Sequence, residues 1–338
     1  HDVIMTPGEY CYFDHYQSDP NTQPPAIGGY IPLRKVYSYD PVPEDSLTPG
    51  EQKHIMGVQA NLWTEWVPTT EHAEYMIFPR LLALSEIAWT PLKEKDYNDF
   101  MQRMQDQYRL LQRHFVNYYR PSYRIHIKAM PDYQKKEYLI HFNTEQYNPL
   151  IHYTADGADP TLQSSVYTNP FYVKGVTTIK AIIFKNDKAM DSPAVYVADY
   201  DKAIGKKVTY NNGGWSSSYP AQRDSTLTNG IDGSLTYQDG QWQGFLHNVD
   251  VTIDMDSVTS LNNLSVRFMQ LIGPGVYMPD SVSVLLSDDD VNFTPAGIAV
   301  NDISPTDPHL LFKSFSVNLK GDKARYIRVK AYIQRGYM

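Results

Sequence analysis

Apolar residues recur with two different periods along this chain, and the change of period falls near residue 120. Before it, short apolar runs at residues 3–6 and 55–62 predict two strands. Residues 71–89 and 97–118 instead carry apolar side chains at helical spacing. The first part of the chain is therefore expected to mix strands with helices.

The two predicted helices have recognisable ends and faces. Thr70 is the expected N-cap of the first helix, and acidic residues follow in its first turn. Pro79 is expected to bend this helix, because proline removes one backbone hydrogen bond. The apolar stripe of the second helix consists of Phe100, Met104, Leu111 and Phe115.

Beyond residue 120 the pattern alternates as strands do. Residues 124–128, 138–142 and 178–184 predict a small immunoglobulin-like sandwich in about 80 residues. A second, larger sandwich follows, and its clearest strands are expected at 249–255, 264–270, 281–287 and 326–332. The two β segments share no period, so the chain is not a repeat array.

These elements predict a multidomain protein. Residues 57–66 form a strand that enters a polar loop, and a helix follows, which is the βα unit of a parallel barrel. We therefore expect the C-terminal portion of a (β/α)8 TIM barrel at residues 1–118 and an immunoglobulin-like sandwich at 119–202. Another sandwich is expected at 203–338. Both ends of the sequence look cut, and the last sandwich is expected to be truncated at its end.

Composition removes several classes of function. The net charge of -8 argues against a nucleic-acid surface, which needs a basic patch. No apolar window approaches the ~20 residues of a membrane span. The single Cys11 excludes an intrachain disulfide, and no spacing of histidine, cysteine and acidic residues indicates a metal site. No cofactor is expected.

The most informative chemistry lies at the end of the second strand, where Trp63 and Trp66 flank Glu65. Indoles cover the apolar faces of a pyranose ring, and a carboxylate accepts hydrogen bonds from its hydroxyls. This combination favours a sugar site. The alternatives remain open: Trp63 could be ordinary barrel packing, Glu65 a solvated acid, and Trp66 a neighbouring subsite or only a cover.

Residues 57–89 resemble the family 20 glycoside hydrolases, the β-N-acetylhexosaminidases. The resemblance runs through the strand and loop at 57–65, then residues 71–76 and 79–86, and the segment Tyr12-Phe13-Asp14 is similar to the preceding strand and loop. In that family the substrate's own acetamido oxygen attacks the anomeric carbon. The resemblance implies that Tyr12 donates to this oxygen and that Trp63 forms a wall around the acetamido methyl group. It also implies that Asp14 binds the hydroxyl at carbon 6 and Glu65 those toward carbon 4.

The family's catalytic Asp-Glu pair is missing, because no Asp is followed directly by Glu in the 338 residues. The resemblance therefore implies that the chain carries only the last two of eight barrel strands. We expect this chain alone to be inactive and to need the rest of the catalytic barrel, upstream of His1, as its partner. The implied substrate is a glycan or chitooligosaccharide with terminal β-linked N-acetylglucosamine or N-acetylgalactosamine. A periplasmic, cell-surface or secreted bacterial location is expected, although no export signal is present.

The β segments carry resemblances of their own. Residues 151–161, 167–170 and 178–181 are similar to the small sandwich that follows some bacterial hexosaminidase barrels. Residues 228–233, 242–245 and 324–329 resemble a discoidin (coagulation factor 5/8 C-type) domain, a jelly-roll-like sandwich. Trp242 is then a candidate sugar platform, although packing in the sandwich core competes with that role. The alternative function for the whole chain is a non-catalytic carbohydrate-binding or adhesion protein.

Overall fold

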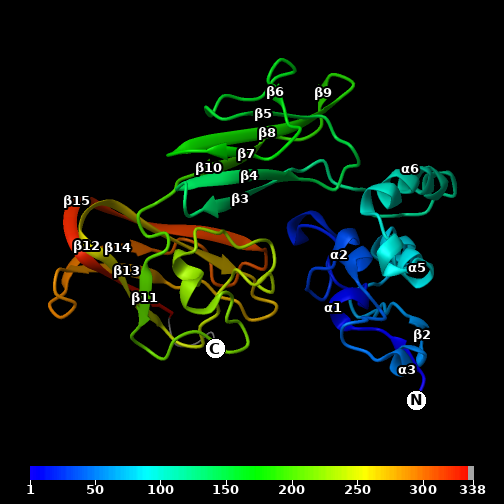
Figure 1. Ribbon diagram of the computed structural model, residues 1–338, viewed down its shortest axis with the longest axis horizontal. Coiled ribbons are helices and arrows are strands. Elements are labelled where there is room, and N and C mark those ends of the chain that lie inside the picture. Colours follow the sequence, from blue (N-terminus) through cyan, green and yellow to red (C-terminus); the bar gives the residue numbers. More distant parts are fainter. Residues whose placement is uncertain (334–338) are drawn as a thin grey trace. The chain divides into compact units, whose positions relative to one another are not determined.

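The computed structural model describes residues 1–333, and the chain folds as two compact units. The first unit spans His1–Pro121 and the second begins at Ser122. Helices gather in the first unit, whereas the second is built almost entirely of strands (Figure 1).

The first unit contains a two-stranded parallel sheet, made of β1 (Val3–Met5) and β2 (Ile55–Val58). Parallel strands need a crossover connection, and here it spans about 50 residues. The connection carries α1 (Gly8–Cys11), η1 (Pro20–Thr22), α2 (Leu33–Ser38) and α3 (Pro49–Gln52). After β2 come α4 (Thr70–Ile77), α5 (Arg80–Trp89), η2 (Leu92–Glu94) and α6 (Tyr97–Arg113).

The expected bent helix at 71–89 is in fact two helices, α4 and α5. Phe78 between them is extended, with φ -99° and ψ 137°. Pro79 explains the break, because it lacks an amide hydrogen and disfavours the helical conformation of the residue before it. The expected N-cap was wrong by one position. The Thr69 hydroxyl, not that of Thr70, accepts the hydrogen bond from the backbone N–H of His72, at 3.1 Å.

Helix α6 ends five residues earlier than expected. Phe100, Met104 and Leu111 are buried along one stripe, as the helical spacing predicts. Phe115 does not belong to that stripe, because its φ of 57° lies outside the helical region and its side chain is 94% exposed. The helical period therefore identified the buried face and overran the end of the helix.

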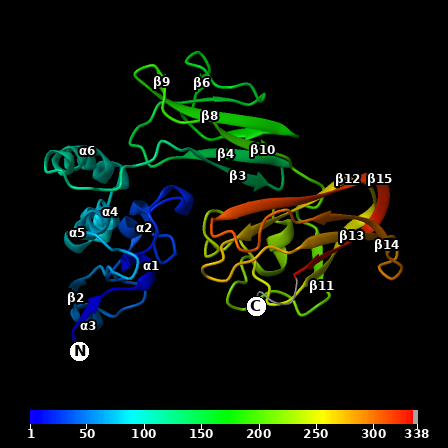
Figure 2. The same cartoon turned by 180° about the vertical axis from the view of Figure 1, so that it is seen from behind.

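The second unit begins with two facing sheets (Figure 2). One has the order β3-β4-β7 and the other β10-β8-β5-β6, with β9 paired to β8. Ile140, Ile179 and Ala181 are fully buried in the core between them. The strands are β3 (His126–Asp132), β4 (Glu137–Asn143), β5 (Ile151–Thr154), β6 (Ser165–Val166), β7 (Phe171–Val173), β8 (Thr177–Lys185), β9 (Lys188–Ala189) and β10 (Ala194–Ala198).

The rest of this unit is a five-stranded antiparallel sheet of order β11-β12-β15-β13-β14. The strands expected at 249–255 and 264–270 are the two ends of one strand, β12 (Val249–Gln270), and 326–332 is only the end of β15 (Leu311–Tyr332). These two strands pair along their length, with irregularities near residues 254–263. The others are β11 (Lys207–Tyr210), β13 (Ser281–Ser287) and β14 (Thr294–Val300), and η3 (Arg223–Thr228) precedes β12.

The long strands double back so that the sheet forms both layers of its own core. A Cβ atom added to Gly297 of β14 would lie 2.5 Å from the Cγ1 atom of Val317, in the first half of β15. The second half of β15 instead pairs edge to edge with β13, from Tyr326 to Tyr332. The end of β15 is thus paired with β13. Phe315, Val317 and Leu319, in the first half of β15, therefore cover one face of β13 and of the strands beside it.

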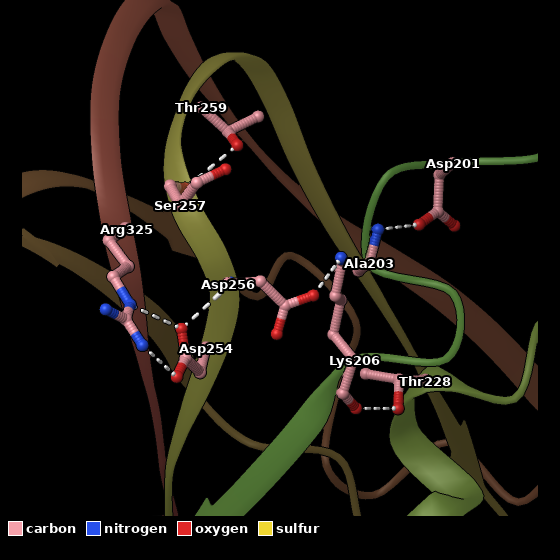
Figure 3. Close-up of polar contacts among 9 residues, drawn as sticks. All are labelled: Asp201, Ala203, Lys206, Thr228, Asp254, Asp256, Ser257, Thr259 and Arg325. Carbon is pink, nitrogen blue, oxygen red and sulfur yellow. Dashed lines mark hydrogen bonds and ion pairs between the residues drawn. The ribbon is translucent and has the colours of Figure 1, made fainter.

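Polar contacts fasten the segment that leads into β11 to the bend in β12 (Figure 3). The Lys206 ammonium pairs with Asp256 at 2.5 Å, and the Thr228 hydroxyl donates to the Lys206 carbonyl. Nearby, Arg325 binds both carboxylate oxygens of Asp254, at 2.9 and 3.0 Å. The tyrosine hydroxyls of Tyr133 and Tyr138 then donate to the carbonyls of residues 229 and 230, so the two β-rich parts share direct hydrogen bonds.

Candidate functional site

The two barrel-type strands of the first unit bring the predicted site segments side by side. Beyond β1 and β2, Tyr12 and Asn61 form a further parallel bridge. The backbone N–H of Asn61 donates to the Cys11 carbonyl at 2.8 Å, and the N–H of Phe13 donates to the Asn61 carbonyl at 2.7 Å. The segments that bear Tyr12 and Trp63 therefore leave neighbouring strands at the same edge of the sheet.

Trp63, Glu65 and Trp66 lie on a tight turn at the surface of this unit. The turn closes with a hydrogen bond from the backbone N–H of Val67 to the Thr64 carbonyl, at 3.2 Å. Val67 is buried against Met76 and anchors the turn. Trp63 and Trp66 are 53% and 50% exposed, and Glu65 is exposed as well. Both indoles and the acid are thus accessible in this unit.

Asp14 has the opposite environment. Its side chain is 2% exposed, and its Oδ1 atom has no hydrogen-bond partner among residues 1–333. Burial raises the pKa of Asp14, and the charge of Glu65 adds to this effect, whereas His15 and Arg80 oppose it. A buried acceptor with an unused lone pair can bind a ligand hydroxyl.

Tyr12 is half-buried at the C-terminal end of α1. Its ring lies 6.2 Å from that of His15, centroid to centroid. His15 is packed against Gly29, where any Cβ atom would approach the imidazole within 2.3 Å, so only glycine fits at this position. Burial lowers the pKa of His15.

Arg80 is the residue at this site that the sequence did not reveal. It is completely buried, and its guanidinium donates to the carbonyls of Phe13, His15, Ile31 and Met76. The only sequence signal was a charged residue at the start of a largely apolar helix. Its partners could not be foreseen, because the three outside its own helix turn are 49 to 67 residues away in the chain.

One open cleft of this unit lies away from the predicted site residues. The cleft, of about 450 Å³, runs between α5 and α6, with Trp89, Phe100 and Met104 along its walls. Arg103 bridges Glu86 and Asp99 beside it. None of the predicted site residues lines this cleft. The candidate sugar site is therefore defined by its strand ends and buried carboxyl, not by this cleft.

In the second unit, Trp242 is surrounded by groups of its own module. Its ring stacks on Phe312 at 5.7 Å, and Arg267 lies over both rings. The indole N–H donates to the Ser234 carbonyl, and Gly233 abuts the ring so closely that a Cβ atom there would lie 2.3 Å away.

No group of three or more histidine, cysteine or acidic side chains is arranged to hold a metal ion in residues 1–333. Asp232, in the turn at 230–233, pairs with Arg267 at 3.7 Å. Over the same described range, no helix combines the length and the apolar character that crossing a membrane requires.

Comparison with protein families gives a match that covers β1, β2 and the turn that bears Trp63 and Trp66. Residues 1–92 match the glycosyl hydrolase family 20 catalytic domain, and residues 133–196 match the chitobiase/beta-hexosaminidase C-terminal domain. The chain therefore contains a family 20, TIM-barrel-type catalytic fragment followed by β-rich domains. Neither match extends beyond residue 196.

Proteins described as hexosaminidases are similar to parts of this chain. A beta-hexosaminidase of Porphyromonas gingivalis is 40% identical over 54% of this chain and 24% of its own length. A beta-N-acetylhexosaminidase of Cellulomonas fimi is 33% identical over 30% of this chain and 20% of its own. Among solved structures, the family 20 β-N-acetylhexosaminidase of Streptomyces coelicolor A3(2) is 28% identical over 35% of this chain and 24% of that one, with a TM-score of 0.31. The chain thus spans about a quarter or less of the length of each of these three proteins.

Proposed function

We propose that this chain is the C-terminal part of a retaining exo-β-N-acetylhexosaminidase. Its substrates are glycans or chitooligosaccharides that end in β-linked N-acetylglucosamine or N-acetylgalactosamine. The observation that carries the proposal is the family 20 match over residues 1–92, which include every proposed sugar contact. The parallel bridge between Tyr12 and Asn61 supports it, because it joins the two contributing segments at one edge of the sheet.

The proposed chemistry needs an acetamido oxygen held against the anomeric carbon. This oxygen forms a bond to that carbon as the glycosidic bond breaks, and water later opens the oxazolinium intermediate with net retention. Tyr12 donates its hydroxyl to the attacking oxygen, and Trp63 covers the acetamido methyl group. Asp14 accepts from the hydroxyl at carbon 6 and Glu65 from those toward carbon 4, with Trp66 beside them as a second aromatic contact.

The leaving oxygen needs a proton, and this chain has no candidate donor of the family's Asp-Glu type. We therefore propose that the chain supplies only part of the active site and works with the rest of the barrel. The exposure of apolar side chains on β1 and β2 supports this. In this two-stranded sheet, Val3, Ile4 and Met56 are 44%, 53% and 71% exposed. Parallel sheets are normally covered on both faces.

The function is tested by release of nitrophenol from a β-N-acetylglucosaminide. We expect no rate above background from this chain alone and hydrolysis from the chain joined to a complete upstream barrel. An inactive complete protein would refute the hexosaminidase assignment. Hydrolysis by the isolated chain would refute the incomplete site and leave the assignment in place.

Glu65→Gln in the complete enzyme is expected to lower kcat/KM by about 10- to 100-fold, because hydrogen bonds to a charged acceptor contribute roughly 1.5–3 kcal/mol. The amide keeps the shape of the carboxylate and removes its charge. Steady-state kinetics on the nitrophenyl substrate measures the effect. Glu94→Gln, on the exposed turn η2, is the matched control and should behave as wild type. Equal rates for both variants would reduce Glu65 to a surface residue.

A second candidate function, glycan binding by the discoidin-like module, depends on Trp242. Since the indole N–H of Trp242 is already bound to Ser234 and its ring is stacked on Phe312, we propose a packing role for it instead. A glycan array probed with the complete chain tests this. Binding that disappears in Trp242→Ala, with the fold retained, would restore the sugar platform and the adhesion function.

A further inference from the structure

Two buried polar side chains, those of Arg80 and Gln17, hold the segment after β1 in place through hydrogen bonds. The Nη2 atom of Arg80 donates to the Phe13 carbonyl at 2.6 Å, and Nη1 donates to the His15 carbonyl at 2.9 Å. The Gln17 amide donates to the Tyr75 carbonyl at 2.5 Å. Both side chains are almost inaccessible, with exposed fractions of 0% and 2%.

The same two side chains bind the C-terminal end of α4. Arg80 reaches the Met76 carbonyl through Nε and Nη2, at 3.1 and 2.5 Å, next to the Tyr75 carbonyl that Gln17 binds. The last carbonyls of a helix lack partners within it and attract positive charge. The end of α4 thus holds the Arg80 guanidinium in a fixed and electrostatically favourable position. From there the guanidinium also reaches the loop after β1.

In the sequence, Asp14 lies between Phe13 and His15, whose carbonyls are two of the four that Arg80 binds. Because the residues on both sides are held, the backbone at Asp14 has little freedom to rotate. The guanidinium also lies over the Phe13 ring, 4.8 Å from its centroid, which fixes that side chain as well. Burial lowers the pKa of Arg80 to about 9, so it remains protonated at neutral pH beside the Asp14 carboxyl. Among residues 1–333 the buried Oδ1 atom of Asp14 has no hydrogen-bond partner, so its hydrogen-bonding capacity remains available to a ligand.

We propose that Arg80, assisted by Gln17, is a positioning residue of the sugar site: by holding the Phe13 and His15 carbonyls, it sets where Asp14 presents its carboxylate to the substrate. Neither residue touches the sugar. The inference rests on the proposed function, in which Asp14 binds the hydroxyl at carbon 6. It deepens that function by assigning recognition of this hydroxyl to a three-residue unit.

The test compares two substrates in the complete enzyme: the nitrophenyl β-N-acetylglucosaminide and its 6-deoxy analogue. Wild type is expected to prefer the parent substrate by about 10- to 100-fold in kcat/KM, the range for a hydrogen bond to a charged acceptor. Arg80→Lys keeps the positive charge but cannot bind both carbonyls, since its ammonium lacks the planar fork. Its preference is expected to fall to about threefold or less, through a loss on the parent substrate alone.

Two further variants keep the outcome decisive. Gln17→Met releases the same segment from α4 without disturbing the buried charge, and it should also reduce the preference for the parent substrate. It therefore provides the test if Arg80→Lys fails to fold. Arg109→Lys, at an exposed arginine paired with Asp106, is the matched control and should retain the full preference. A merely structural role would lower both substrates equally, so a folded Arg80→Lys or Gln17→Met variant with wild-type preference overturns the inference.

The failures are distinguishable. A complete enzyme that hydrolyses neither substrate contradicts the proposed function itself. If the wild type is active but shows no preference between the two substrates, Asp14 does not recognise the hydroxyl at carbon 6, and the inference is wrong as well. An intact preference in the variants contradicts the positioning role alone.

Discussion

Tyr12→Phe in the complete enzyme is expected to lower kcat by roughly 30- to 900-fold, with a small change in KM. The phenol is proposed to donate to the acetamido oxygen as it attacks, and loss of one donor to a reacting oxygen typically costs about 2–4 kcal/mol in the transition state. The substitution removes one oxygen atom and leaves the aromatic ring in place. Steady-state kinetics with a nitrophenyl β-N-acetylglucosaminide measures both parameters.

Tyr10→Phe is the matched control for this prediction. Tyr10 lies two residues earlier, on α1, and its ring stacks on Tyr39 at 4.8 Å, away from the strand bridge that Tyr12 forms. We expect the control to keep wild-type turnover. If Tyr12→Phe did the same, the donor role would be wrong and Tyr12 would be a packing residue of the strand end.

The sequence allowed the strand ends of the site to be predicted, but not the support beneath them. Trp63 and Glu65 could be proposed as site residues because an apolar strand leads straight into them, and Tyr12 because Asp14 follows two residues later. Their roles stay predictions. Arg80 could not be found in this way. Its partners are backbone carbonyls, which every residue carries, so no pattern of side chains marks the positions that it binds.

Periodicity was reliable within an element and poor at its ends. The helical pattern continued through Pro79 and through Phe115, although the backbone breaks at the first and turns to positive φ at the second. Apolar spacing reports the buried face of a helix, whereas the end depends on backbone hydrogen bonds that the side chains do not encode. For the same reason, the N-cap was predicted one residue from its true position at Thr69.

In the second unit, a visible signal was missed. Residues 314–320 alternate between exposed and buried positions, with Phe315, Val317 and Leu319 inside, and this alternation stands in the sequence as clearly as that of 326–332. The two expected strands 249–255 and 264–270 are joined through a polar stretch that bends without ending the strand. A bend of this kind needs the pairing of β12 with β15, which is not visible in the sequence. The polar residues alone therefore suggested a loop.

That inward row makes Leu319 a sensitive position for the stability of the second unit. Leu319→Ala is expected to lower the free energy of unfolding by about 3 kcal/mol, since truncating a buried leucine loses apolar burial and leaves a cavity. Leu319 is 1% exposed, in the core that Val284, Phe315 and Ile327 also share. A loss of this size is a large part of the stability of a typical domain.

Native-state hydrogen exchange is the appropriate measurement, because a chain of two units need not unfold in one step. The amides of β12 and β15 should exchange faster in Leu319→Ala, while those of α6 in the first unit should be unchanged. Leu246→Ala is the matched control, since Leu246 is 74% exposed in the same unit, and it should leave exchange in both strands at the wild-type rate. Equal protection in the two variants would mean that the first half of β15 does not cover the core, and that the doubled-back arrangement of this sheet is wrong.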